Sequence, residues 1–263
     1  MELFNKLRNI VLAVEYNGGR YFGFQWQKDR PTIQDELEMA ILKLIGEERR
    51  VTAACRTDSG VHARGQVVSF RTDSVLPVKA FVSGLNHFLP KDISVLRAGT
   101  VSAGFNVMKD AVSREYRYLI LNRRPRASLG NDMYYHVAAE LDAGQMDLAS
   151  KLLIGEHDFA SFVTDWDREQ STVRMIYDTG VQREGEEVAF HVRAKSFLTH
   201  QVRNMVGTLV RVGTGKMGIE EFRNILEMKK LSLAGPTAPA HGLCLMKVIY
   251  KDNSEFKYEN LCT

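Results

Sequence analysis

The chain has 263 residues, of which 44% are hydrophobic, and its 35 basic and 32 acidic side chains leave a formal charge of +3 at pH 7. This composition is sufficient for a full hydrophobic core, in one large domain or two lobes, and it argues against intrinsic disorder. A charge of +3 is too small to identify a nucleic-acid-binding protein, so local clusters of basic residues must decide that question.

The first hundred residues alternate between strand-like and helix-like patterns. Thr32 is expected to cap a helix, because its hydroxyl can accept a hydrogen bond near Asp35 and apolar side chains then recur at helical spacing as far as Ile45. Gly18 and Gly19 predict a turn directly after the first strand. Strands are expected at residues 10–16, 51–55, 66–70 and 93–101, and a second helix is expected to begin at Pro77.

Residues 109–126 form the most basic stretch of the chain. The stretch holds six basic and two acidic residues, interleaved with Tyr116 and Tyr118. If residues 114–121 form a strand, these tyrosines share one face with Ile120, and that face can either stack nucleic-acid bases or pack into the core. The basic residues are Lys109, Arg114, Arg117, Arg123, Arg124 and Arg126.

A helix predicted at residues 198–212 carries polar side chains beside its apolar stripe. His200, Arg203, Asn204 and Gly207 fall on one side, which indicates either a solvated face or contact with a ligand or another backbone. Together with the remaining elements, the pattern predicts an α+β fold in which helices flank a largely antiparallel central sheet. Those elements are helices at 143–153 and 219–229, a hairpin of 173–183 with 187–195, and a strand at 243–250.

Residues 56–63, Arg-Thr-Asp-Ser-Gly-Val-His-Ala, place one carboxylate, one guanidinium and two hydroxyls between two expected strands. Asp58 should therefore lie on a tight connection held at both ends, a kind of loop that carries function more often than packing. Asp-Ser-Gly by itself also occurs in ordinary turns. His62 is expected to order the loop rather than to act as an acid or base.

The whole octet resembles the catalytic loop of the tRNA pseudouridine synthase A family, whose usual form is Gly-Arg-Thr-Asp-Ala-Gly-Val-His. Residues 197–207, Phe-Leu-Thr-His-Gln-Val-Arg-Asn-Met-Val-Gly, are similar to the family's helix whose arginine reaches the active site. Residues 114–118, Arg-Glu-Tyr-Arg-Tyr, are similar to the strand whose first tyrosine faces the reacting uridine. Shorter matches at 15–25, 34–37, 85–93 and 242–243 keep the family's order along the chain.

This resemblance implies an isomerase that breaks the bond from ribose C1′ to uracil N1, turns the bound base and rejoins it through C5. It implies Asp58 as the nucleophile, kept ionised by Arg56, either attacking C1′ or first abstracting a sugar proton. Tyr116 would stack on the uracil and can take the C5 proton, whereas a buried structural tyrosine is the alternative. Arg203 would pair with Asp58 or contact the RNA backbone.

The resemblance further implies a tRNA substrate, modified on a flipped-out base at uridine 38, 39 or 40 of the anticodon stem-loop, and a homodimer. It implies two ferredoxin-like halves, which we expect at residues 1–104, with the catalytic loop, and 105–263. No cofactor and no metal are expected, because the sequence has no Gly-rich phosphate loop and no metal-ligand spacing. The alternatives are a paralogue with a different RNA target and a catalytically weak RNA-binding relative. The expected substrate-binding residues are Arg56, Arg114, Arg117, Tyr118, Arg123 and Arg124.

Several positions depart from the family pattern. Cys55 stands where glycine is usual, Ser59 where alanine is usual, and Phe24 where tryptophan is usual. Met108 stands where the family often has an arginine near the RNA-binding region. Since the three expected active-site residues are retained, these changes bear on the choice of uridine more than on the reaction class.

Cysteine usage and hydropathy bound the setting of the protein. Cys55, Cys244 and Cys262 are odd in number and far apart, so neither a disulfide framework nor a zinc site is indicated. The N-terminal residues lack a signal-peptide pattern, and no apolar run approaches the roughly 18 residues that cross a bilayer. We therefore expect a soluble cytoplasmic protein without a membrane partner.

Overall fold

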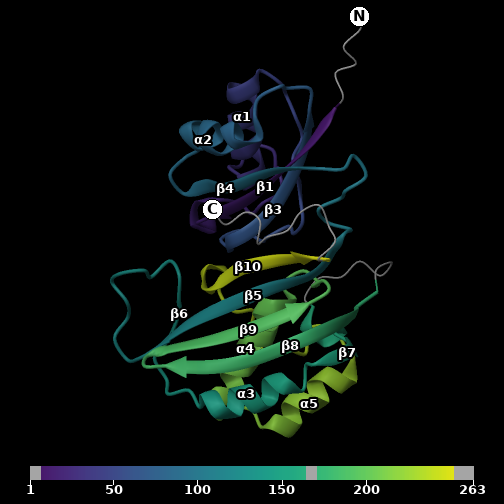
Figure 1. Ribbon diagram of the computed structural model, residues 1–263. Helices are drawn as coiled ribbons and strands as arrows, with labels where there is room; N and C mark the ends of the chain where they lie inside the picture. The colour runs from purple at the N-terminus through teal and green to yellow at the C-terminus, as the bar shows by residue number, and fades with distance from the viewer. Residues whose placement is uncertain (1–6, 164–170, 252–263) are drawn as a thin grey trace, which may run out of the picture. The chain divides into compact units, whose positions relative to one another are not determined.

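The structure, a computed structural model, describes residues 7–163 and 171–251 and divides the chain into two compact units (Figure 1). The first unit consists of two segments, one that ends at Val112 and one that begins at Leu245. The second unit is Ser113–Cys244. The boundary expected after residue 104 stays a prediction. Both units mix helices with largely antiparallel strands, which confirms the α+β class.

The first unit has the β-α-β-β-α-β order of a ferredoxin-like half. Its strands pair antiparallel in the order β4-β1-β3, and the short β2 pairs with β3. Helix α1 packs against α2, which packs along β4 (Figure 1). The elements are β1 (Arg8–Tyr16), a 3-10 turn η1 (Gly18–Arg20), α1 (Ile33–Ile45), β2 (Thr52–Ala53), β3 (His62–Thr72), α2 (Val78–Phe88) and β4 (Ile93–Val101).

The expected capping of α1 is confirmed. The Thr32 hydroxyl accepts a hydrogen bond from the Asp35 amide at 3.3 Å, and Gly46 ends the helix in a left-handed conformation with φ of 71°. The apolar stripe of α1, including Ile33, Leu37 and Ile41, is buried, as are residues 10–14 of β1. Burial of such side chains stabilises the unit by about 1.5–3 kcal/mol each.

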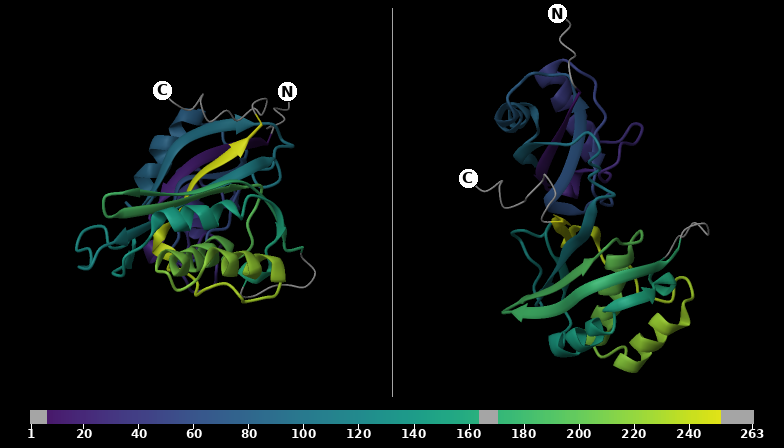
Figure 2. Two further views of the ribbon diagram at one scale, coloured as in Figure 1. Left: turned by 90° about the horizontal axis from the view of Figure 1, so that it is seen from below. Right: turned by 45° about the vertical axis from the view of Figure 1, so that its right-hand side comes forward.

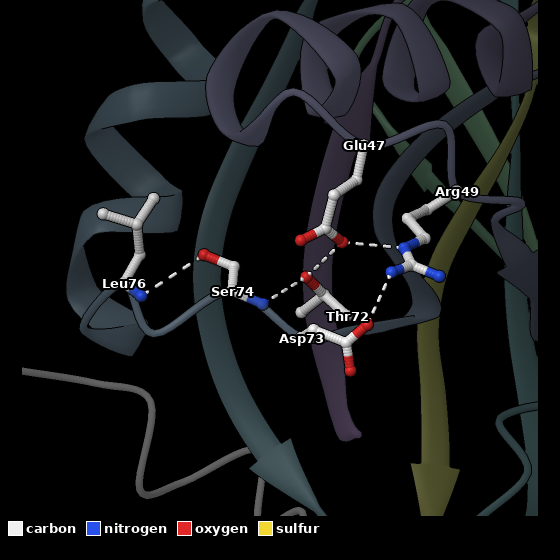
Figure 3. A network of polar contacts seen from close by, with 6 residues as sticks. All are labelled: Glu47, Arg49, Thr72, Asp73, Ser74 and Leu76. Atoms are coloured by element: carbon white, nitrogen blue, oxygen red, sulfur yellow. Dashed lines mark hydrogen bonds and ion pairs between the residues drawn. The ribbon is translucent and has the colours of Figure 1, made fainter. Parts of the chain in front are cut away.

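A polar network joins the end of α1 to the end of β3 (Figure 3). Arg49 donates to Glu47 at 2.7 Å and to Asp73 at 3.0 Å, and the buried Thr72 hydroxyl donates to the same Glu47 oxygen at 2.7 Å. Burial raises the pKa of the Glu47 carboxyl, but the hydrogen bonds from Thr72 and Arg49 outweigh this effect, so the pKa lies below its ordinary value. The ionised Glu47 therefore fixes the connection that follows α1.

The second unit repeats the order β-α-β-β-α in β5-α3-β8-β9-α4 and continues into β10. Strands β5, β9, β8 and β7 are neighbours in that order with antiparallel pairing, and β6 pairs parallel with β5. Figure 2 shows α3, α4 and α5 gathered on one face of the β8–β9 hairpin. The elements are β5 (Ala111–Asn122), β6 (Tyr135–Val137), α3 (Ala143–Lys151), β7 (Gly155–Asp158), η2 (Ala160–Phe162), β8 (Val173–Glu184), β9 (Glu187–Ala194), α4 (Gln201–Gly213), α5 (Ile219–Met228), η3 (Ala240–Gly242) and β10 (Leu243–Tyr250).

Most predicted elements are present, and the differences lie at their ends. Helix α4 begins at Gln201 rather than at residue 198, because His200 has a φ of 59°, which ends the run of helical backbone. The strand predicted at 51–55 is reduced to the two residues of β2, whereas β3 begins four residues before Gln66. Strands β6 and β7 were not predicted.

Candidate active site

Asp58 lies in the loop that joins β2 to β3, and hydrogen bonds close this loop on itself. The Val61 amide donates to the Asp58 carbonyl at 3.1 Å. Gly60 has a φ of 79°, in the left-handed region that favours glycine. Asp58 is partly exposed, between the buried Thr57 and the exposed Ser59. The predicted tight connection is confirmed, and its central residue remains accessible.

The segment that follows η1 runs against this loop. The Tyr21 carbonyl accepts a hydrogen bond from the Gly60 amide at 3.3 Å, and the Phe24 amide donates to the Thr57 carbonyl at 3.0 Å. Gly23 has a φ of 94°, and a Cβ there would lie 2.9 Å from the Thr57 carbonyl oxygen. Only glycine allows so close a backbone approach, so this segment fixes the conformation of the loop.

Tyr21 is itself held in place by its side chain. The Tyr21 hydroxyl donates to Asp92 at 2.7 Å, and the Asp92 carbonyl accepts from the Asn17 amide at 2.9 Å. Burial, followed by the hydrogen bond to Asp92 and its charge, raises the pKa of Tyr21 well above its ordinary value. The tyrosine is therefore neutral and acts as a structural support of the segment that contacts the Asp58 loop.

A buried amide supports the loop from the interior. Gln66, which has no exposed surface, donates to the Cys55 carbonyl at 2.8 Å and to the Tyr16 hydroxyl at 3.3 Å, and it accepts from the Cys55 amide at 3.3 Å. The Tyr16 hydroxyl is hydrogen-bonded to the Thr57 hydroxyl at 2.8 Å. Strands β1 and β3 thereby hold the backbone immediately before Asp58.

His62 orders the end of the loop that leads into β3, as predicted. It is buried, and its Nδ1 accepts a hydrogen bond from the Gly18 amide at 3.1 Å. Gly18 packs so closely that a Cβ would lie 2.0 Å from the Val61 carbonyl oxygen. Arg56, by contrast, is exposed; it lies on the β2 side of the loop, two residues before Asp58.

In the second unit, Tyr116 projects from β5 against an aromatic partner. Its ring meets that of Phe197 edge to face, with centroids 5.3 Å apart and an interplanar angle of 89°. Tyr116 is 8% exposed and lies opposite Val192 of β9. The predicted common face of Tyr116, Tyr118 and Ile120 is confirmed, because all three are buried.

Tyr118 occupies an interior position. Its ring is fully buried, and its hydroxyl donates to the Pro239 carbonyl at 2.7 Å. A Cβ on Gly242 would lie 2.6 Å from this ring, so the chain passes directly over it. Burial raises the pKa of Tyr118, and the nearby Arg203 opposes the rise only in part. This is the environment of a core tyrosine, and the substrate-binding role expected for Tyr118 stays a prediction.

Arg203 is hydrogen-bonded to the segment that connects α5 to β10. Its Nε donates to the Ala238 carbonyl at 2.8 Å, and the Ala238 amide donates back to the Arg203 carbonyl at 3.1 Å. Two neighbours on the same side of α4 also contact this segment. Asn204 accepts from the Thr237 hydroxyl at 2.6 Å, and a Cβ on Gly207 would lie 1.7 Å from the Pro236 carbonyl oxygen.

The polar side of α4 is therefore a contact with another backbone rather than a solvated face. Residues 236–238 lie along it, and both Asn204 and Gly207 are buried. Arg203 lies close enough to Tyr118 for its positive charge to lower the pKa of that tyrosine in part. Asp58 belongs to the first unit and Tyr116 and Arg203 to the second, so their meeting in one site stays a prediction.

The basic residues expected to bind substrate differ in their surroundings. Arg114 is buried and donates to the Lys195 carbonyl at 2.7 Å. Arg117 pairs with Glu187 at 2.7 Å, and Arg123 pairs with Glu186 at 2.9 Å, so two of the cations are opposed by carboxylates. The remaining candidate of this stretch, Arg124, is exposed.

Comparison with known proteins assigns the chain to a family. The sequence profile of the tRNA pseudouridine synthases matches residues 12–107 and 149–251. The tRNA pseudouridine synthase A of Pelobacter propionicus is 43% identical over 244 residues, which cover 93% of this chain and 100% of that protein. The chain belongs to the tRNA pseudouridine synthase A family.

Other members of the tRNA pseudouridine synthase A family are similar over the same extent. The protein of Roseiflexus sp. (strain RS-1) is 42% identical over 251 residues, covering 94% of this chain and 92% of that protein. The protein of Thermoanaerobacter sp. (strain X514) is 38% identical over 244 residues, covering 93% and 100%. Family membership makes the chain an isomerase of the tRNA pseudouridine synthase class.

Some residues that build the site were not singled out in the sequence. Gln66 and Tyr16 look like ordinary strand residues, and residues 236–238 follow no periodic pattern. A buried glutamine between apolar neighbours in Gly-Gln-Val-Val was the available signal for Gln66, since a buried amide must find hydrogen-bond partners.

The described residues, 7–163 and 171–251, contain neither a candidate metal site nor a candidate membrane span. Within these residues, no three His, Cys, Asp or Glu side chains gather closely enough to hold a metal ion. None of the helices described there combines the length and apolar character needed to cross a membrane.

Proposed function

We propose that the chain converts uridine to pseudouridine in the anticodon stem-loop of tRNA, at position 38, 39 or 40, with Asp58 as the nucleophile. The observation that carries this proposal is the Asp58 loop, in which a partly exposed acid is held by Gln66, Tyr16 and the segment at Tyr21. Because the loop is fixed before substrate binds, it needs little reorganisation during the reaction.

The reaction needs no external oxidant, reductant or group donor. The C1′–N1 glycosidic bond breaks, the uracil turns, and a C1′–C5 bond forms, while the C5 proton is lost and N1 becomes protonated. The Asp58 carboxylate either attacks C1′ to form a covalent ester or removes a sugar proton to give a glycal. Both routes use the same carboxylate.

Tyr116 and Arg203 complete the proposed site. Tyr116 stacks on the detached uracil and accepts the C5 proton, and Arg203 pairs with the Asp58 carboxylate. The edge-to-face contact with Phe197 and the hydrogen bond to Ala238 support these assignments, because they hold the Tyr116 ring and the Arg203 guanidinium in single orientations.

The target base must leave its stack before Asp58 can approach it. Arg56, Arg114, Arg117, Arg123 and Arg124 are proposed to position the RNA backbone, with shape dominating over base identity. Tyr118 is proposed to contribute to substrate binding indirectly, by holding the neighbouring residues of β5 in place. We further propose that the enzyme acts in the cytoplasm as a homodimer.

Mapping of pseudouridine in a single tRNA tests the proposed target. Purified protein is incubated with an unmodified transcript that carries uridines at 38, 39 and 40, and each position is then read by base-specific chemical labelling. Product at one or more of these positions, absent with Asp58→Ala, is expected. Product confined to another RNA site would instead indicate a paralogue with a different target, and binding without product would indicate a catalytically weak relative.

A further inference from the structure

Residues 21–30, here called the aromatic loop, expose two large rings beside the Asp58 loop. Phe22 is 40% exposed and Trp26 is 44% exposed. Each ring is covered by an arginine: Arg30 lies 4.6 Å from the centroid of Phe22, and Arg50 lies 5.6 Å from that of Trp26. Large rings with one accessible face and a cation nearby are the usual means by which proteins stack unpaired nucleotides.

A closed set of hydrogen bonds holds Trp26 and Arg50 in this arrangement. The Trp26 amide donates to Gln34 at 3.0 Å, Gln34 donates to Glu38 at 2.7 Å, and Arg50 donates to the second oxygen of Glu38 at 2.9 Å. Glu38 is fixed in turn by the Val51 amide at 3.0 Å. The tryptophan and its arginine are therefore positioned without a ligand, although both lie at the surface.

A hollow of about 170 Å³ adjoins this network within the first unit. Its volume is below the roughly 300–1,000 Å³ of pockets that enclose drug-sized ligands, so it suits a single base or sugar-phosphate. Arg56, two residues before Asp58, forms one wall, and Gln34 forms another. The remaining lining is Phe24, Gln25, Val51, Thr52, Ala53 and Met108.

The hollow is tied directly to the proposed catalytic loop. Phe24, which lines it, donates from its amide to the Thr57 carbonyl at 3.0 Å. A nucleotide seated against Arg56 would therefore contact the chain two residues before Asp58, next to the proposed position of the target uridine.

We propose that this hollow and Trp26 form a subsite for one unpaired nucleotide adjacent to the target uridine. The nucleotide's base stacks on Trp26, and its phosphate is bound by Arg50 and Arg56. Arg50 can donate to a phosphate while paired with Glu38, because a guanidinium has five N–H donors and the Arg50 side chain is 70% exposed. This inference rests on the proposed function and adds a subsite to it.

Tryptophan fluorescence tests the stacking directly. The chain has two tryptophans, so in a Trp166→Phe variant the emission comes from Trp26 alone. Titration with unmodified tRNA is expected to quench this emission in proportion to the RNA bound, because a stacked base quenches indole. A titration in which tRNA binds, as judged by filter retention, without quenching Trp26 would overturn the proposal.

Steady-state kinetics of pseudouridine formation test the energetic contribution. Trp26→Ala is expected to raise KM for tRNA roughly tenfold to a hundredfold, with kcat within twofold of wild type, and Trp26→Phe is expected to recover most of the loss. Val75→Ala, which removes an exposed apolar side chain of the same unit (85% exposed), should leave both constants unchanged. Circular dichroism confirms that each variant is folded.

The outcomes separate this proposal from the proposed function. An unchanged KM in Trp26→Ala, or a loss confined to kcat, overturns the subsite even when wild type forms pseudouridine and Asp58→Ala does not. Absence of product from the wild-type protein would contradict the proposed function, whereas the fluorescence titration would still decide whether RNA stacks on Trp26.

Discussion

At the scale of single residues, the buried end of the Asp58 loop depends on one side-chain amide. Gln66 accepts a hydrogen bond from the buried Cys55 amide and donates one to the Cys55 carbonyl. Gln66 also donates to the Tyr16 hydroxyl, which is in turn hydrogen-bonded to the Thr57 hydroxyl. A change at Gln66 should therefore alter the loop without touching Asp58.

We predict that Gln66→Leu lowers the free energy of unfolding by about 2–4 kcal/mol, since two buried backbone groups lose their partner at roughly 1–3 kcal/mol each. The variant should also lower kcat more than it raises KM, because the loop is displaced rather than the RNA surface. Urea unfolding and steady-state kinetics measure the two effects.

Gln182→Leu is the matched control, since Gln182 is an exposed residue of strand β8. It should change the unfolding free energy by less than about 0.5 kcal/mol. If Gln66→Leu were as stable and as active as the control, the support assigned to Gln66 would be wrong.

At the scale of elements, the junction between α1 and β3 links stability to pH (Figure 3). The pKa of Glu47 is lower in the folded protein than its ordinary value of 4.5. A group with a lowered pKa contributes stability above its unfolded pKa, and that contribution is lost as the pH falls through the folded pKa. The contribution is therefore complete at neutral pH.

We predict that Glu47→Gln destabilises the protein at pH 7 by about 1 kcal/mol, through weaker hydrogen bonds from Thr72 and Arg49. The difference from wild type should shrink as the pH falls below about 4.5, because the wild-type carboxyl is then protonated as well. Thermal unfolding across this pH range measures it. Glu48→Gln, a change of an exposed neighbour, should show no such trend; a pH-independent difference for Glu47→Gln would contradict the assignment.

Periodicity predicted most elements because their burial is regular. The bounds of β4 and β10 agree with the strands expected at 93–101 and 243–250, and α1 agrees with its cap at Thr32. The beginning of α4 could not be predicted, because no pattern in the sequence indicates the left-handed conformation of His200. The two-residue β2 is also set by its partner strand rather than by its own sequence.

The candidate site was predictable only where it coincides with a motif. Asp58, Tyr116 and Arg203 were proposed through resemblance, and the ordering role of His62 was expected from the loop chemistry. The supports at Gln66 and Ala238 join residues far apart in the chain, and no local pattern reports such contacts. The aromatic loop was likewise missed, since the exposure of Trp26 follows from the fold.

At the scale of the whole molecule, the small net charge of +3 makes the pairing of each cation important for RNA binding. Arg117 is already neutralised in part by Glu187, whereas Arg124 is exposed. A phosphate contact releases counterions in proportion to the charge it neutralises. An exposed arginine should therefore contribute more to the salt dependence than a paired one.

We predict that Arg124→Ala weakens tRNA binding and lowers the slope of log K against log salt concentration by roughly 0.7–0.9. Arg117→Ala should change this slope by less, because the charge of Arg117 is already neutralised in part by Glu187. Filter binding between about 50 and 200 mM salt measures both variants. Equal slopes for Arg124→Ala and wild type would exclude Arg124 from the phosphate contacts.

We propose that a single carboxylate, held by the β2–β3 connection, carries out the chemistry. The most direct measurement is the single-turnover rate of pseudouridine formation at saturating enzyme with Asp58→Asn, which keeps the size of the side chain and removes its charge. We predict a loss of at least about a thousandfold, with tRNA affinity within a few-fold of wild type and no loss for Glu48→Gln. A rate for Asp58→Asn within tenfold of wild type would contradict the claim.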